Sequence, residues 1–359
     1  MDPGAPDSSL ILPLRFQIGE RTLATVRRRL LSRSQDLESL LDAADVALPP
    51  LPPHADGLLL RSVASDQLGT IEARADDLLL YVRQRYPRHY ARLEGSFEEY
   101  LAGFSPKSRS TLKRKVRRFE QLSGGRLDVR EYRTPVQMET FHALARLVSK
   151  KTYQERLLGS GLPDGEAFRA EMLASAAEDN ERGYLLFLAG EPVSYLYAPV
   201  RQGCVIYSHL GYDPALAAHS PGTVLQLEAM ARLFAERHHR FFDFTEGDGQ
   251  HKRLFATGCV DCADVLLLRP SLSNRVLIAT HRNFHLGVEA LGNVAERWGV
   301  KARLKKWLRG TPTLEATNGG AATAGASETE RAPARRPKAG RPARNHGLAD
   351  EARNADRDL

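Results

Sequence analysis

The sequence has little cysteine and no long apolar run. Its 359 residues include only three cysteines, Cys204, Cys259 and Cys262, too few for a disulfide scaffold in a chain of this length. No segment holds about 18 consecutive apolar residues, and the N-terminal stretch lacks the basic and apolar regions of a secretory signal. These absences argue against a disulfide-rich secreted domain. We expect a cytoplasmic protein that is not integral to the membrane.

Aromatic residues are missing from the C-terminal stretch. Residues 311–359 contain no Phe, Trp or Tyr and few large apolar residues, so this segment cannot bury enough surface to offset its ordering entropy. We predict a disordered tail there and a disordered N-terminus at 1–9. The proline-rich LPPLPP at 48–53 excludes helix and predicts a connector.

The remaining sequence has ordinary globular composition. Hydrophobic residues make up 42% and charged residues 26%, and the length allows two domains of about 150 residues each. The formal charge of +7 favours anionic partners such as phosphates, nucleotides or membrane surfaces, but it says nothing about fold.

Apolar spacing predicts a chain that mixes strands and helices. Ser96 and Glu99 have the spacing of a capping box, and Ser105 followed by Pro106 is typical of a second helix start. Strands are predicted at 14–18, 57–63, 77–83, 183–189, 192–200, 204–210, 240–244 and 263–269. Helices are predicted from Ser96 and at 105–122, 134–151, 164–180, 220–238, 250–256 and 274–308.

The helix at 105–122 is strongly basic. Its stretch KSRSTLKRKVRR (107–118) carries seven basic residues and no acid around an apolar stripe of Leu112, Val116 and Phe119. Such a helix could bind phosphate, nucleic acid or an acidic glycan intermediate, or it could be a solvated face whose stripe docks on the core. The residues leave both interpretations open.

Ionisable groups gather in DFTEGDGQHKRLFA (243–256), directly after the apolar Phe241 and Phe242. The segment holds three carboxylates, an imidazole and an ammonium, at Asp243, Glu246, Asp248, His251 and Lys252. A solvated loop and an active site at the end of a buried strand are both consistent with this pattern.

Three longer stretches carry a family resemblance. GEPVSYLYAPV, GYDPALAAHSPGTVL and FFDFTEGDGQHKRLFA resemble the CelD-type, cellulose-biosynthesis-associated branch of the GNAT acyltransferases, which is similar to the FemAB transferases. The resemblance covers roughly residues 80–270. It implies an α/β fold with a mixed sheet flanked by helices and two GNAT-like units in tandem: a degenerate first unit at 10–95 and an acyltransferase domain at 96–310.

The resemblance also implies a reaction. An acetyl or other acyl group would pass from acyl-CoA to an amine or hydroxyl, with a cell-envelope polysaccharide or sugar precursor as one acceptor class. Two alternatives stay open. One is FemAB-like transfer from aminoacyl-tRNA, in which the basic helix meets RNA, and the other is a non-catalytic binding protein of a polysaccharide system.

The start of the helix after residue 219 is the predicted donor site. A helix N-terminus has free N–H groups and a positive dipole end that can hold a pyrophosphate. The GNAT loop reads Q/R-x-x-G-x-G/A, whereas this chain has Ala217, Ser220 and Gly222 at the matching positions, and Pro221 has no N–H. The predicted cofactor-binding residues are His209, Leu210, Ser220, Gly222, Thr223 and Val224.

Acyl transfer needs a base for the nucleophile and a donor for the oxyanion, and Glu246 and Lys252 fit these roles. By resemblance, the K-x-x-F element of FemAB-like proteins corresponds to Lys252 and Phe255. Asp243 is either a catalytic carboxylate or a structural acceptor, and we favour the structural role. Cys259 and Cys262 have C-x-x-C spacing, but no second ligand pair is present, so no metal is expected.

Overall fold

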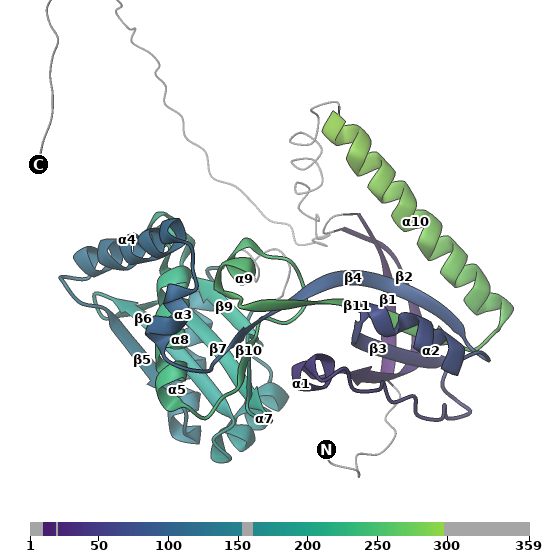
Figure 1. Cartoon of the computed structure of the whole chain (residues 1–359), viewed down its shortest axis with the longest axis horizontal. Helices are drawn as coiled ribbons and strands as arrows, with labels where there is room; N and C mark the ends of the chain where they lie inside the picture. Colours follow the sequence, from purple (N-terminus) through teal and green to yellow (C-terminus); the bar gives the residue numbers. More distant parts are fainter. Residues whose placement is uncertain (1–9, 19–20, 153–160, 298–359) are drawn as a thin grey trace, which may run out of the picture. The chain divides into compact units, whose positions relative to one another are not determined.

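The computed structural model describes residues 10–18, 21–152 and 161–297 (Figure 1). The predictions for 1–9, 298–308 and the tail at 311–359 lie outside these residues. Helices flank a large mixed sheet, which confirms the predicted α/β fold class. Within the described ranges, every helix is too short or too polar to serve as a transmembrane span.

Eleven strands of the described residues form one sheet in the order β1-β2-β3-β11-β4-β10-β8-β7-β6-β5, and β9 also pairs with β7. Most neighbours are antiparallel, but β2 runs parallel to β3, and β10 runs parallel to β8. The strands are β1 Leu10–Ile18, β2 Arg21–Ser34, β3 Gly57–Ala64, β4 Leu79–Arg92, β5 Asp128–Tyr132, β6 Glu181–Leu188, β7 Glu191–Arg201, β8 Cys204–Ile206, β9 His209–Tyr212, β10 Phe241–Asp243 and β11 Gly258–Leu268.

The helices begin at the predicted capping signals. Ser96 accepts from the amide of Glu99, whose side chain accepts from the Ser96 amide in return, and Ser105 caps the basic helix. The helices are α1 Leu37–Leu41, α2 Leu68–Arg74, α3 Phe97–Ala102, α4 Pro106–Leu122, α5 Pro135–Ser149, α7 Glu166–Ala177, α8 Pro221–Glu236, α9 Gln250–Phe255 and α10 Leu272–Arg297, with short 3₁₀ turns at Ser65–Gln67 and Pro214–His219.

Strand β6 is buried on both faces. Tyr184 and Leu186 pack with α8 in one core cluster, whereas Leu185 and Phe187 pack with α5 and α7 in another. Because successive side chains of a strand point to opposite faces, the continuous apolar run GYLLFLA serves two helical layers at once.

Strand β3 is covered in the same way. Leu58 and Leu60 pack with Ile71 of α2, whereas Leu59 packs with Leu277 of α10. The described residues therefore contain two regions of sheet, each with helices on both faces.

Several predicted strand limits were wrong. The predicted strand at 204–210 is two strands, because the Tyr207 amide donates to β10 while the Ser208 amide donates to Tyr197 of β7. The strands predicted at 77–83 and 263–269 are longer, and they pair with each other from Leu79 opposite Leu268 to Tyr90 opposite Gly258. Their polar residues have backbone partners in this ladder, which hydropathy alone does not indicate. Strand β5 was not predicted.

The division into units at 10–95 and 96–310 stays a prediction. Strand β11 comes from the second range, but it pairs with β3 and β4 of the first. Strand β4 in turn pairs with β10 of the second range. The two ranges therefore exchange strands within the sheet.

Candidate active site

The candidate site lies where β8 and β10 stop pairing. The two strands run parallel from Phe241 opposite Cys204 to Asp243 opposite Ile206, and the last bond is donated by the Tyr207 amide to the Asp243 carbonyl at 2.8 Å. Beyond this point β9 pairs only with β7 among the described strands, and the chain after β10 enters the loop at 244–249. Polar side chains therefore gather at the end of a buried strand.

Asp243 is held by Arg88 of β4. The carboxylate is 1% exposed and accepts from Arg88 Nη2 at 2.5 Å and from Arg88 Nε at 3.2 Å. Its Oδ1 also accepts from the Thr245 amide at 2.8 Å. Burial lowers the pKa of Arg88, but its bonds with Asp243 outweigh this effect and raise the pKa of the guanidinium. These contacts support the structural role favoured for Asp243.

Glu246 lies on the exposed part of the loop. The backbone turns through positive φ at Thr245 (60°) and Gly247 (100°), which carries the Glu246 side chain away from the buried strand. Gln84 Nε2 lies 3.4 Å from Glu246 Oε2. Among the described residues, Gln84 is the hydrogen-bond partner of this exposed carboxylate, so the carboxylate is accessible to a ligand.

Lys252 turns back from α9 toward this loop. Its Nζ donates to the Glu246 carbonyl oxygen at 2.5 Å, so the backbone of Glu246, and not its carboxylate, orients the ammonium. The side chain is half-buried, and burial lowers the pKa of Lys252, although Asp243 and Glu246 partly offset the effect. The predicted base and the predicted oxyanion donor are thus brought into one turn.

Asp248 and His251 have other contacts. Asp248 Oδ1 lies 3.0 Å from His89 Nε2, and its Oδ2 accepts from Arg253 at 3.1 Å. The His251 ring lies 5.7 Å from that of Tyr207, and burial followed by the charge of Lys252 lowers the pKa of His251. Asp248 therefore fastens α9 to β4.

The backbone of Ser220 shapes the start of α8. Ser220 adopts a left-handed conformation (φ 55°), and its carbonyl accepts from the amides of both Thr223 and Val224. Its side chain does not cap the helix. Pro221 has no N–H to offer. Among the described residues, the Gly222 amide has no hydrogen-bond acceptor, so it is available to a ligand.

A lysine from the basic helix reaches this helix start. Lys115 Nζ donates to Thr223 Oγ1 at 3.3 Å. Burial and the neighbouring Arg114 lower the pKa of Lys115, because its charge is partly removed from water. Lys115 is not among the residues predicted from the sequence, but the sequence does indicate its position. It follows buried Leu112 by three residues and precedes Phe119 by four, which places it on the inward face of α4.

The two predicted β9 residues face different layers. Leu210 packs with the core beneath α8, and a Cβ on Gly222 would lie 3.0 Å from its Cδ2, so glycine permits this close packing. The His209 ring lies near Tyr197 and Phe168, which belong to the cluster beneath α5 and α7. Burial lowers the pKa of His209. The structure does not bring the His209 side chain to the start of α8.

The C-x-x-C pair is part of strand β11. Cys259 is exposed whereas Cys262 is buried, since residues three apart on a strand point to opposite faces. Among the residues that the structure describes, no group of three or more His, Cys, Asp and Glu side chains could hold a metal ion.

The site falls within a known domain family. Residues 106–253 match the family described as Acetyltransferase (GNAT) domain, a range that includes α4, the start of α8, Glu246 and Lys252. None of the curated proteins matches the chain. The chain therefore contains a GNAT acetyltransferase domain.

Several solved structures are distantly similar. A conserved protein of unknown function from Bacteroides thetaiotaomicron is 14% identical with a TM-score of 0.44, and the match covers 59% of this chain and 70% of that one. L-PGS from Bacillus licheniformis is 14% identical with a TM-score of 0.41, covering 62% and 72%. FemX is 12% identical with a TM-score of 0.43, covering 73% and 88%. None of these similarities assigns a substrate.

Proposed function

We propose that this chain is an acyltransferase that moves an acyl group from acyl-CoA to an amine or hydroxyl. The observation that supports this most is the arrangement within the matched GNAT range: Glu246 and Lys252 share one turn after β10, and Lys115 reaches the N-terminus of α8. A base, an oxyanion donor and a cationic helix start are the groups that transfer from a thioester with a pyrophosphate handle requires.

The helix start fits the pyrophosphate of coenzyme A. Three groups lie at the positive end of this 16-residue helix. They are the Gly222 amide, the Thr223 hydroxyl and the Lys115 ammonium. An anion here would also favour the charged form of Lys115, which burial disfavours. We therefore assign donor binding to Gly222, Thr223 and Lys115, and we give Ser220 and Val224 the role of shaping the turn.

Glu246 and Lys252 divide the chemistry. Glu246 accepts the proton of the acceptor amine or hydroxyl as that group attacks the thioester carbonyl carbon. Lys252 has three N–H donors and gives one to the Glu246 carbonyl, so others can stabilise the oxygen that becomes negative. The C–S bond then breaks, and the CoA thiolate leaves and takes up a proton. Asp243 holds Arg88 and the loop, and it has no proton-transfer role.

The acceptor is the finer part of the proposal. Following the CelD-type resemblance, we propose a cell-envelope polysaccharide or a sugar precursor, which offers both hydroxyl and amino groups. The support for this acceptor class is the resemblance of residues 80–270 alone.

Transfer from aminoacyl-tRNA is the second candidate, and the outer face of α4 favours it. Arg109, Lys113, Arg114, Arg117 and Arg118 line a surface hollow of about 860 Å³. Among the described residues, no carboxylate forms an ion pair with any of them. A row of cations without counterions suits a phosphate backbone.

Replacement of Lys252 tests the proposal. Lys252→Ala should fold and bind acetyl-CoA but release CoA thiol roughly 100- to 1000-fold more slowly, since it loses one oxyanion donor. Thiol release would be followed with acetyl-CoA and a panel of amines and sugars. Gln250→Ala is the matched control, because it truncates an exposed side chain of the same helix. Equal rates for Lys252→Ala and the wild type would refute the assignment.

A further inference from the structure

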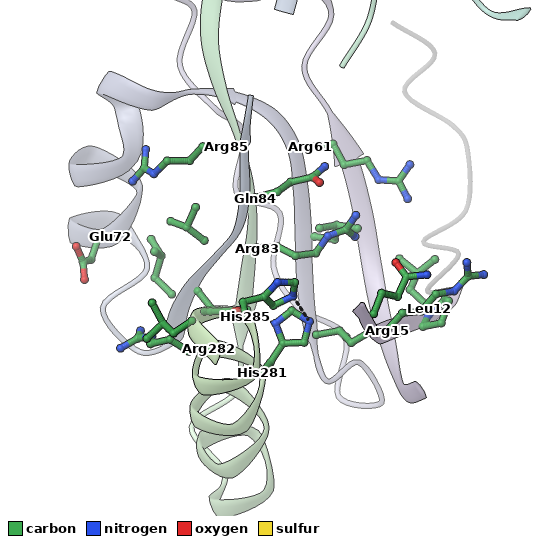
Figure 2. A pocket seen from close by; sticks show the side chains of 18 residues that line it. Leu12, Arg15, Arg61, Glu72, Arg83, Gln84, Arg85, His281, Arg282 and His285 are labelled. Carbon is green, nitrogen blue, oxygen red and sulfur yellow. Dashed lines mark hydrogen bonds between the residues drawn. The ribbon is translucent and has the colours of Figure 1, made fainter. Parts of the chain in front are cut away.

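A second cavity lies in the N-terminal part of the chain, away from the start of α8. Its volume is about 1050 Å³, and residues of β1, β3, β4, α2 and α10 line it (Figure 2). No residue of α4, α8 or the loop at 244–249 contributes to its wall. It is therefore distinct from the proposed donor site.

The cavity wall is strongly basic. Five arginines, two histidines and one acidic residue, the exposed Glu72, belong to it. Among the described residues, the five arginines form one ion pair, between Arg83 and Asp264 at 3.9 Å. Like charges around one hollow repel each other unless an anion compensates them. The arginines are Arg15, Arg61, Arg83, Arg85 and Arg282.

Two β-bulges aim arginines at this hollow. On one side of β11 the register passes from Val63 opposite Ala263 to Leu60 opposite Val265, so β3 carries one extra residue at Arg61 and Ser62. On the other side β4 carries the extra residue Arg83. A bulge redirects the side chains next to it, and bulges are frequent beside functional sites.

Buried Asp264 holds both bulges. Ser62 has a positive φ of 54°, an uncommon conformation for a residue other than glycine, and its amide donates to Asp264 Oδ1 at 3.1 Å. Tyr86 donates to the same oxygen at 2.9 Å, and Gln84 Nε2 donates to Oδ2, also at 2.9 Å. Strain of this kind persists where the surroundings enforce it, and it clusters at ligand sites.

Aromatic and imidazole groups complete the wall. Tyr81 Oη lies 2.7 Å from His281 Nδ1, and His281 Nε2 lies 3.3 Å from His285 Nε2. Figure 2 shows the Arg61 and Arg83 side chains on one side of this histidine pair and those of Arg85 and Arg282 on the other. Leu12 and Leu286 add apolar surface. The cavity thus combines separated guanidinium groups with an apolar wall.

We propose that this cavity binds an organic phosphate with two or more phosphate groups. Guanidinium groups pair with phosphate oxygens through two parallel hydrogen bonds, and guanidinium groups on both sides of the cavity suit more than one phosphate. The apolar wall accepts the organic part of the ligand. Such a ligand is either a soluble molecule of the nucleotide-sugar type or the phosphate-bearing headgroup of a lipid. The inference does not depend on the proposed acyl transfer.

The test compares two double variants of the full chain. Arg61→Gln/Arg85→Gln removes cavity arginines, and Arg27→Gln/Arg29→Gln removes two exposed arginines of β2 that do not line the cavity. Pyrophosphate binding would be measured by calorimetry at low ionic strength. Flotation with phosphatidylcholine vesicles, with and without cardiolipin, whose headgroup carries two phosphates, would test the lipid source. Circular dichroism would confirm that both variants fold.

We expect binding to weaken at least about tenfold in the cavity variant and to stay unchanged in the β2 variant, because hydrogen bonds to charged groups are among the strong ones. Loss of pyrophosphate binding without a change in vesicle binding identifies a soluble ligand, and loss of vesicle binding identifies a lipid headgroup. If neither probe distinguishes the cavity variant from the β2 variant, the inference is wrong. Release of CoA thiol from acetyl-CoA by the same proteins reports separately on the proposed acyl transfer.

Discussion

At the residue scale, the partner of Asp243 determines what that carboxylate can do. An aspartate between two phenylalanines is consistent with a proton-transfer group or with a structural acceptor. The structure adds Arg88, which lies 155 positions earlier in the chain and binds both carboxylate oxygens. A contact of that sequence separation depends on the fold, and no local pattern indicates it.

The ion pair with Arg88 implies that Asp243 contributes to the stability of the fold. Asp243→Asn leaves the buried Arg88 without its counterion and should lower the free energy of unfolding by about 3–5 kcal/mol, measured by urea denaturation. The control is Asp128→Asn, which breaks the exposed pair with Arg130 and should cost at most about 1 kcal/mol. Similar losses in the two variants would show that the Arg88 pair has no special role.

Other residues of the site differ in how far the sequence reveals them. Glu246 and Lys252 could be proposed from the sequence because they are close in the chain and chemically suited to acyl transfer. Lys115 is harder to identify because it is one of seven cations in the basic helix. Only its position relative to the buried apolar residues of that helix distinguishes it from the six other cations. His209 points away from α8 because successive side chains of a strand point to opposite faces of the sheet. The residue pattern shows this alternation, but it does not show which helix covers which face.

At the element scale, α8 has functional groups at both ends. Its N-terminus carries the proposed donor site, and its last residue, Glu236, joins a buried charge cluster. Arg182, which is 1% exposed, donates to Glu236 through Nη2 at 2.8 Å, and His239 Nε2 lies 3.1 Å from the same carboxylate. This cluster fastens the end of α8 to β6.

The cluster predicts a pH dependence of stability. Burial raises the pKa of Glu236, but hydrogen bonds from His239 and Arg182 outweigh it and lower the pKa to about 2, from an ordinary value of 4.5. A depressed pKa contributes stability above the unfolded value, and that contribution is lost as pH falls toward 2. At about 1.4 kcal/mol per pKa unit, the contribution at neutral pH is about 3 kcal/mol.

Glu236→Gln tests this dependence. The difference in unfolding free energy between wild type and variant should be constant above about pH 5 and shrink as pH falls from about 4.5 toward 2. Urea denaturation at a series of pH values measures it. Glu178→Gln, at an exposed position, should show almost no difference at any pH. A Glu236→Gln difference that did not change with pH would contradict the account.

The elements themselves were predictable to different degrees. Helices α4 and α5 begin with serine or threonine caps and proline, and these local signals hold in the structure. The break between β8 and β9 was not predictable, because it depends on the change of partner from β10 to β7 at Tyr207 and Ser208. The early start of β11 was hidden by its polar first residues, which are supported by pairing with β4.

At the scale of the whole chain, the sheet joins the proposed acyltransferase site to the second cavity. Gln84 lines that cavity, and its Nε2 lies 2.9 Å from Asp264 Oδ2 and 3.4 Å from Glu246 Oε2. The α/β class could be predicted from alternating strand and helix patterns. The insertion of β11 between β3 and β4 could not, because it pairs residues about 170 to 210 positions apart.

The central claim is that acyl-CoA binds at the start of α8, and calorimetric titration with acetyl-CoA tests it most directly. We predict that the wild type binds, that Lys115→Ala binds about tenfold more weakly, and that Lys113→Ala, which changes an exposed lysine of the same helix, binds like the wild type. Equal affinities in the two variants, or no binding by the wild type, would contradict the claim. Salt-sensitive binding of aminoacyl-tRNA in place of acetyl-CoA would support the second candidate function.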